Sequence, residues 1–286
     1  MKKVAAALIV LTLIAARAVA ADVRPIVVEV YTSQGCNSCF AANTMAGKVA
    51  QRPGLLVLSF PVTYWDMFGW KDTLASDDNT KRQKAYASAL RRGGVYTPQM
   101  IIDGAKDVPA AREDAVSYAL TLAAMARDDG MQSDIATPAV ARHDRLPADV
   151  AFVAAMRVKT PARSAWSVGV ALAKRPDDLH VVVDRAPDVA RRGNIDATVW
   201  LFRLRSAASV KIGGGENAGQ TIAYRNVVTS ITNAGHWRGE PLTIDVPKAG
   251  PKGPVHDAVA VVVQQGGYGR IVGAALVGNA TFYAPW

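Results

Sequence analysis

The two cysteines of this 286-residue chain, Cys36 and Cys39, are separated by only two residues. They follow an apolar run, Ile26–Tyr31, which predicts a strand buried on both faces. The next segment, Phe40–Val49, has the pattern of a helix. A helix N-terminus presents unpaired N–H groups and the positive end of the helix dipole, which together stabilise a thiolate. We therefore expect Cys36 to be a nucleophile with a lowered pKa, and Cys39 to be the thiol that resolves its mixed disulfides.

The cysteine pair also has two alternative roles. A permanent disulfide would close a loop with only two intervening residues, whereas structural bridges stabilise more when the closed loop is longer. A metal site would need further ligands beside the two thiolates. We expect no metal, and no cofactor other than the disulfide, because the histidines are better explained as surface or hydrogen-bonded residues of the second half of the chain. They are His143, His180, His236 and His256.

Residues 1–20 have the pattern of a secretory signal peptide. Two lysines follow Met1, an apolar segment continues to Ala16, and Ala18–Ala20 is an Ala-x-Ala cleavage signal. The apolar segment is short for a membrane span. We therefore expect an exported protein, periplasmic or secreted and without a stable membrane anchor, in a compartment where disulfides persist.

Composition and length narrow the class of protein. The formal net charge is +9, but the arginines are scattered rather than gathered in one run with aromatic residues, so we expect no nucleic-acid partner. Half of the residues are hydrophobic, which is enough for a substantial core. The length predicts two domains, which we place at residues 21–130 and 131–286. No feature of the sequence indicates an oligomeric state.

The first domain alternates strand and helix patterns. Continuous apolar runs predict buried strands, and apolar residues at helical spacing predict helices. Asp103 and Gly104 predict a hairpin turn. The expected elements are a strand at 26–31, a helix at 40–49, a strand at 55–62, an aromatic loop at 64–72, a helix at 81–92 with its start at Asp77–Thr80, a strand with its hairpin turn at 95–104 and a helix at 109–127.

The second domain has a different pattern. Short alternating β segments are separated by Gly, Pro and Asp turns. Strands at this spacing are typical of a β-sandwich. The expected segments are 150–159, 166–173, 180–183, 198–205, 221–231, 243–246, 258–264 and 271–277.

The element order of the first domain, with Cys-x-x-Cys at a strand-to-helix junction and Thr97-Pro98 at a later strand, resembles the thioredoxin fold. This resemblance implies a cis peptide bond at Pro98 that faces the cysteines. The backbone of Thr97 would then pair with an incoming peptide and orient its disulfide near Cys36. The expected fold is an α/β thioredoxin-like N-terminal domain with a helical insertion, followed by an all-β sandwich-like C-terminal domain.

Several longer motifs carry a second, more specific resemblance. They are Tyr31–Cys39, Val62–Asp66, Gly69–Asp72 and Val95–Gln99, with a weaker match at Gly215–Gly219 and Asn226–Val228. These motifs resemble a family of secreted proteins known as domain of unknown function 1223. The resemblance implies a thioredoxin-like fold and an unassigned redox role. Members often follow the second cysteine with Pro-Pro-Ala-Asp, whereas this chain has Phe40–Asn43, which leaves a more regular helix start and one negative charge fewer near the thiols.

The aromatic loop has two interpretations. Its rings pack the core of an inserted subdomain, or they form an apolar wall beside the cysteines that accepts a partner peptide. Charged neighbours supply a candidate buried group that tunes proton transfer for Cys39. The candidate wall and tuning residues are Tyr64, Trp65, Asp66 and Trp70, with Phe68, Lys71 and Asp72 beside them.

The glycine-rich segment Gly213–Gly219 superficially resembles a phosphate-binding loop. It lacks the Lys-Ser/Thr end and the following helix of such loops, so a wide hairpin turn is the better interpretation.

These observations favour an exported thiol–disulfide oxidoreductase. Its catalytic residues would be Cys36 and Cys39, and Thr97 and Pro98 would orient the partner, a protein or small-molecule thiol or disulfide. The alternative is a non-catalytic binding or scaffold protein in which Cys36 and Cys39 form a structural disulfide.

Overall fold

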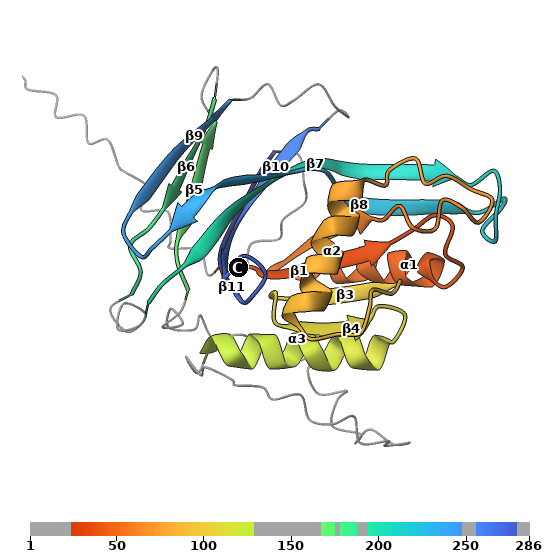
Figure 1. Cartoon of the computed structure of the whole chain (residues 1–286), viewed down its shortest axis with the longest axis horizontal. Coiled ribbons are helices and arrows are strands. Elements are labelled where there is room, and N and C mark those ends of the chain that lie inside the picture. The colour runs from red at the N-terminus through yellow and green to blue at the C-terminus, as the bar shows by residue number, and fades with distance from the viewer. Residues whose placement is uncertain (1–23, 129–166, 175–177, 188–193, 248–255, 279–286) are drawn as a thin grey trace, which may run out of the picture.

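The computed structural model describes residues 24–128, 167–174, 178–187, 194–247 and 256–278 (Figure 1). The first part of the chain contains three helices and four strands within these residues, and only strands follow. The elements are β1 (Ile26–Thr32), α1 (Cys39–Val49), β2 (Leu55–Pro61), α2 (Asp77–Ala89), β3 (Gln99–Ile102), β4 (Lys106–Pro109), α3 (Glu113–Asp128), β5 (Val170–Lys174), β6 (Asp178–Val183), β7 (Ala197–Lys211), β8 (Thr221–Trp237), β9 (Leu242–Pro247), β10 (Ala258–Gln265) and β11 (Ile271–Gly278).

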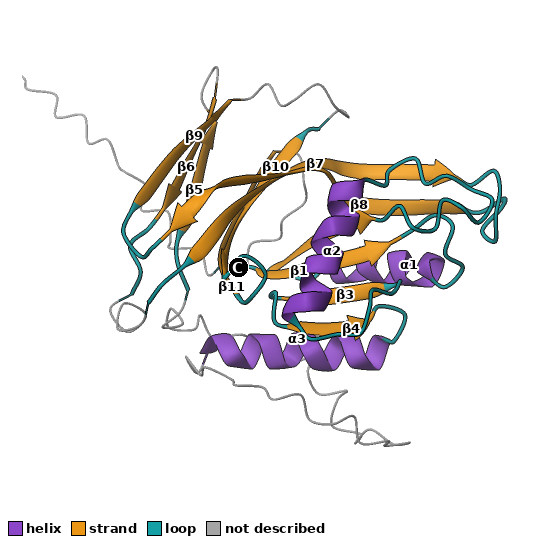
Figure 2. Cartoon of the chain, viewed as in Figure 1, coloured by secondary structure: helices purple, strands orange, loops and turns teal. Residues whose placement is uncertain are grey.

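One large mixed sheet passes through both parts of the chain (Figure 2). Its eight described strands have the order β11-β10-β7-β8-β2-β1-β3-β4. The expected architecture, a thioredoxin-like domain with a helical insertion followed by a β-sandwich-like domain, is therefore wrong. The described chain is mostly β, and the strands assigned to the second domain extend the sheet of the first.

The two parts of the sheet meet where β2 and β8 pair in parallel, with Ser59 opposite Val227. The Ser59 hydroxyl donates to the Arg225 carbonyl at 2.8 Å, across 166 residues of sequence. Asn226 adopts a positive φ of 47°, which asparagine tolerates better than most residues, and its amide donates to the Val57 carbonyl at 2.8 Å. Apolar patterns predict that both segments are strands, but they carry no information on which strands pair. This junction between β2 and β8, here called the seam, was therefore not predicted.

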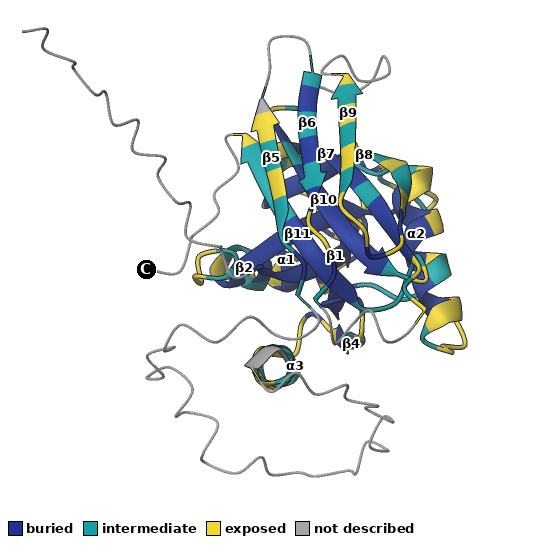
Figure 3. Cartoon of the chain, turned by 90° about the vertical axis from the view of Figure 1, so that its left-hand side faces the viewer, coloured by how far each residue is buried: buried dark blue, intermediate teal, exposed yellow. Residues whose placement is uncertain are grey.

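A second, antiparallel sheet has the order β5-β6-β9. Its apolar side packs on β7, β10 and β11, where Val181 joins a buried cluster with Leu201 and Val263. Figure 3 shows β5, β6 and β9 in front of the buried strands of the large sheet. Each predicted β segment from residue 166 onward contains a strand, which confirms the local pattern although the predicted sandwich is wrong. Segment 150–159 lies outside the described residues.

The helices cover both faces of β1, β2 and β3. On one face Tyr86 of α2 packs in the same cluster as Phe60 and Phe202, so this core spans both parts of the sheet. On the other face α1 and α3 pack around Val28 and Met100. None of the described helices is both long and apolar enough to span a membrane.

Helix boundaries follow local chemistry. The Ser76 hydroxyl accepts from the Asn79 N–H at 3.2 Å and caps α2, close to the predicted start. The predicted start of the third helix at Pro109 is wrong, because Pro109 pairs with Gln99 as the last residue of β4 and the helix begins at Glu113. The expected domain boundary at residue 130 falls in 129–166, outside the described residues, and stays a prediction.

Candidate functional site

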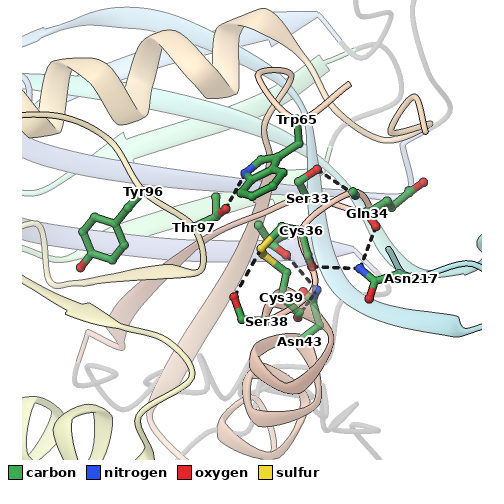
Figure 4. Close-up of a disulfide and its surroundings, with 12 residues drawn as sticks. Ser33, Gln34, Cys36, Ser38, Cys39, Asn43, Trp65, Tyr96, Thr97 and Asn217 are labelled. Carbon is green, nitrogen blue, oxygen red and sulfur yellow. Dashed lines mark hydrogen bonds between the residues drawn. A yellow bond between two sulfur atoms is a disulfide. The ribbon is translucent and has the colours of Figure 1, made fainter. Parts of the chain in front are cut away.

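Cys36 and Cys39 form a disulfide at the start of α1 (Figure 4). Cys39 is the first residue of the helix and Cys36 lies in the turn before it. Only 1% of Cys36 and 0% of Cys39 is exposed, whereas Asn37 and Ser38 between them are exposed. The first turn of α1 contains no acidic residue, so no carboxylate there offsets the positive end of the helix dipole. The predicted cysteine pair at a strand-to-helix junction is confirmed as a disulfide.

Trp65 connects the cysteine turn to Thr97. Its indole N–H donates to the Thr97 hydroxyl at 2.7 Å. Its carbonyl oxygen lies so close to Gly35 that a Cβ added there would be 3.3 Å away. The bond between Thr97 and Pro98 is cis, as the resemblance implied. In the view of Figure 4, Trp65 and Thr97 lie on one side of the disulfide, so the structure brings these predicted residues together.

Two other aromatic residues of the loop have different surroundings. The Tyr64 hydroxyl donates to the Gln83 side chain of α2 at 3.2 Å, which directs this ring toward the helix. Phe68 is 56% exposed, and its ring centroid is 5.3 Å from that of Trp65. Tyr64 is only partly exposed, so Phe68 is the more exposed ring of this pair beside Trp65.

Gln34, two residues before Cys36, fixes the cysteine turn to the aromatic loop. It is fully buried. The Trp70 indole N–H donates to the Gln34 side-chain oxygen at 2.8 Å, and the Gln34 backbone N–H donates to the Asp72 carboxylate at 2.8 Å. The predicted wall residue Trp70 therefore acts on the cysteine turn through Gln34.

The hairpin turn between β7 and β8 covers Trp70. A Cβ added at Gly213 would lie 2.8 Å from the Trp70 ring, and one at Gly214 would lie 2.9 Å from the Gly69 carbonyl. Glycine is needed here because the turn packs directly against the aromatic loop. The segment Gly213–Gly219 thus connects two strands as a hairpin turn, as the sequence analysis favoured, and its glycines serve packing.

Asn217, at the tip of this hairpin, reaches the cysteine turn. Its side-chain amide is fully buried and donates to the Gln34 and Cys36 carbonyls, at 2.9 Å each. Asn217 was not among the predicted site residues. The available indication was its place in the weaker family match, where one asparagine stands among glycines.

Asp72 is the buried acid of the site. Only 3% of it is exposed, and burial raises the pKa of its carboxyl to about 6, although the Gln34 and Leu74 N–H groups favour the charged form. Asp66 is placed differently, since its carboxylate accepts from the Asp72 backbone N–H at 3.0 Å. Their predicted role in tuning Cys39 stays a prediction.

Comparison with known proteins identifies the family. The model of the family described as protein of unknown function DUF1223 matches residues 27–146 and 147–264. The chain belongs to this family. No curated protein matches it.

Two solved structures resemble this DUF1223 chain. The crystal structure of protein AGR_C_4864 from Agrobacterium tumefaciens is 28% identical, with a TM-score of 0.63, and the alignment covers 90% of this chain and 95% of that one. The structure of HBP35 of Porphyromonas gingivalis is 11% identical, with a TM-score of 0.54, covering 91% and 77% of the two chains. The second similarity shows a shared fold alone.

The Asp72 carboxyl gives the DUF1223 chain a testable dependence of stability on pH. The folded protein holds the Asp72 proton up to about pH 6, whereas an unfolded aspartate loses it near pH 3.9. The folded state therefore binds more protons between these values, and the free energy of unfolding falls as the pH rises from about 4 to about 6. We expect Asp72→Asn to remove a fall of about 2–3 kcal/mol over this range, measured by urea denaturation at several pH values.

Asp78→Asn is the control for this measurement. Asp78 is exposed and pairs with Lys81 at 3.1 Å on the surface of α2, so its loss should leave the slope with pH unchanged. An Asp72→Asn variant with the wild-type slope would contradict the assignment.

Among the described residues of this DUF1223 chain, no three His, Cys, Asp or Glu side chains are placed to share a metal ion. His180 lies on β6 and His236 on β8, while His143 lies outside the described residues.

Proposed function

We propose that the protein exchanges its Cys36–Cys39 disulfide with the thiols and disulfides of protein or small-molecule partners. The observation that carries this proposal is the position of the disulfide at the N-terminus of α1, where it joins the preceding turn to the first residue of the helix. A bridge with only two intervening residues removes little entropy from the unfolded chain, so stability alone is a weak reason for it. The positive end of α1 favours the Cys36 thiolate once the bridge opens.

The exchange proceeds in two displacements. A partner thiolate attacks the sulfur of Cys36, the bond between Cys36 and Cys39 breaks, and Cys39 leaves as a thiolate that takes up a proton. The second thiolate of the partner then attacks the partner sulfur that is bonded to Cys36. This step forms the disulfide of the partner and releases the Cys36 thiolate. Two electrons pass from the partner dithiol, which becomes a disulfide, to the cysteine pair. The direction depends on the reduction potentials of the two pairs.

The residues around the disulfide supply a place for a partner chain. Thr97 and Pro98 orient its backbone, and Trp65 holds Thr97 in place through the indole hydrogen bond. Large apolar side chains are exposed in the flanking segments, at Phe40 (38%), Met67 (79%) and Phe68 (56%). We further propose that the chain is exported, as residues 1–20 predict, to a compartment in which such exchange operates.

Trapping of mixed disulfides tests the exchange. In the reverse direction the Cys36 thiolate attacks a partner disulfide, and Cys39 then resolves the mixed disulfide. Cys39→Ser leaves Cys36 without this resolving thiol, so we expect it to accumulate mixed disulfides with glutathione and with extract proteins, visible on non-reducing gels. Cys36→Ser is the matched control and should accumulate at least tenfold less, because the positive end of α1 makes Cys36 the attacking thiolate and leaves Cys39 only the resolving role. Equal trapping by the two variants, or none by Cys39→Ser, would contradict the proposal.

A second function, a binding protein with a structural disulfide, is favoured by one observation. Neither cysteine is exposed by more than 1%. For this function the reduction potential should lie below about −300 mV, and the thiol pKa of the reduced protein should be near 8.5. Equilibration in glutathione buffers, with thiolate absorbance measured against pH, separates the two functions.

A further inference from the structure

The hairpin between β7 and β8 binds the backbone of the cysteine turn on both sides of Gly35. The two carbonyls that accept from the Asn217 amide belong to Gln34 and Cys36, and they flank Gly35. The Cys36 carbonyl also accepts from the Cys39 backbone N–H at 3.1 Å. One side chain from the second part of the chain therefore clamps the turn in which the disulfide closes.

The hairpin is shaped to deliver this amide. Gly215 and Gly219 have positive φ values of 71° and 83°, which favour glycine. Four backbone hydrogen bonds close the turn: from Ala218 to Gly215, from Gln220 to Asn217, from Gly219 to Ile212 and from Ile212 to Gln220. The packing of the glycines on Trp70 then sets the depth to which Asn217 reaches.

We infer that Asn217 is a positioning residue for disulfide exchange, which holds Cys36 in its disulfide conformation and so favours the oxidised form over the dithiol. This inference rests on the proposed function. Opening the bridge separates the two sulfurs and frees the turn before α1 to move. The two hydrogen bonds from Asn217, in contrast, fit the conformation that the turn adopts when the disulfide is closed. Loss of the clamp thus destabilises the oxidised form more than the reduced form, and the pair becomes easier to reduce.

Redox equilibration of the full chain in dithiothreitol buffers tests this inference. In these buffers both thiols of dithiothreitol are oxidised to a cyclic disulfide as the Cys36–Cys39 bond is reduced. We expect Asn217→Ala to shift the equilibrium toward the dithiol about fivefold to tenfold, as the loss of two buried hydrogen bonds predicts. A tenfold shift corresponds to about 30 mV in reduction potential.

Asn226→Gly is the matched control. It also removes a buried amide that donates to a backbone carbonyl, but at the seam with β2, and glycine accepts the positive φ of this position. We expect both variants to lower the midpoint of thermal unfolding, and only Asn217→Ala to shift the redox equilibrium. Equal shifts in the two variants, or no shift in Asn217→Ala, would overturn the inference.

Asn217→Ser covers the case in which the alanine variant does not fold. A hydroxyl has one proton to donate, so it satisfies at most one of the two carbonyls and should produce an intermediate shift of about twofold to threefold. An Asn217→Ser variant with the same redox equilibrium as the wild type would overturn the inference. The wild-type potential tests the proposed function separately. A value below about −300 mV would reject the proposed exchange while leaving the difference between wild type and variant measurable.

Discussion

Replacing Glu29 by glutamine is expected to lower the free energy of unfolding by about 3–5 kcal/mol, because it leaves the Arg82 charge buried without its counter-ion. The two side chains form a bidentate pair at 2.7 Å, with side-chain exposures of 0% and 1%. Tyr31 and Tyr86 donate their hydroxyls to the same carboxylate at 2.9 and 2.6 Å. Burial and the Glu29 charge raise the pKa of both tyrosines, so they remain neutral donors.

The Arg82 environment makes this loss hard to compensate. Burial alone would lower the pKa of Arg82, but the Glu29 carboxylate raises it above the usual arginine value, so the charge persists. The guanidinium carbon also lies 4.9–5.7 Å from five ring centroids contributed by both parts of the chain. The rings are those of Phe60, Tyr86, Trp200, Phe202 and Tyr268.

Asp114→Asn provides the exposed comparison for urea denaturation. Asp114 also pairs with an arginine, Arg112, at 2.6 Å, but the arginine side chain is 66% exposed. Surface pairs of this kind contribute about 1 kcal/mol or less. Similar losses of unfolding free energy in the Glu29 and Asp114 variants would show that the buried pair stabilises the protein no more than the exposed pair does.

Gly104→Ala is expected to destabilise the protein by about 2–5 kcal/mol, the sum of a left-handed backbone penalty and a steric one. Gly104 has a φ of +70°, and a Cβ there would lie 2.1 Å from the Gly269 carbonyl and 2.8 Å from the Gln264 side chain. The β3–β4 turn therefore packs without space against the turn between β10 and β11. The Asp103 carbonyl adds a hydrogen bond from the Ile271 N–H at 2.9 Å.

Gly54→Ala separates the two contributions to this loss. Gly54 has a similar φ of +76° and no atom within 4 Å of the position of its Cβ, so only the backbone penalty of about 1–2 kcal/mol applies. The difference between the two variants in urea denaturation measures the contact between the turns. Equal losses would mean that this contact adds nothing.

Local elements were predictable because their causes are local. The continuous apolar run that became β1 and the Asp77–Thr80 start of α2 each depend on neighbouring residues. The sheet order depends on contacts such as those of Asn226 with β2, which join residues 169 positions apart. A polar side chain that donates to a distant carbonyl has the same sequence pattern as one in a surface loop. The pairing of β2 with β8 therefore had no local signal, and the prediction of two separate folds was wrong.

The candidate site shows the same division. Cys36 and Cys39 were predictable because spacing and a strand-to-helix junction carry their chemistry. Asn217 was not, because its importance comes from the packing of Gly213 on Trp70, which places a hairpin from the second part of the chain on the cysteine turn.

The seam between β2 and β8 has a consequence for the newly made chain. Synthesis from the N-terminus produces β2 well before Arg225 and Asn226, whose groups meet Ser59 and Val57 at its edge. Until then this apolar strand has an unpaired edge, the kind of surface through which nascent chains associate wrongly. Pairing over so long a separation is slow. The large sheet is therefore complete only once the late part of the chain that carries β8 is available to pair with β2.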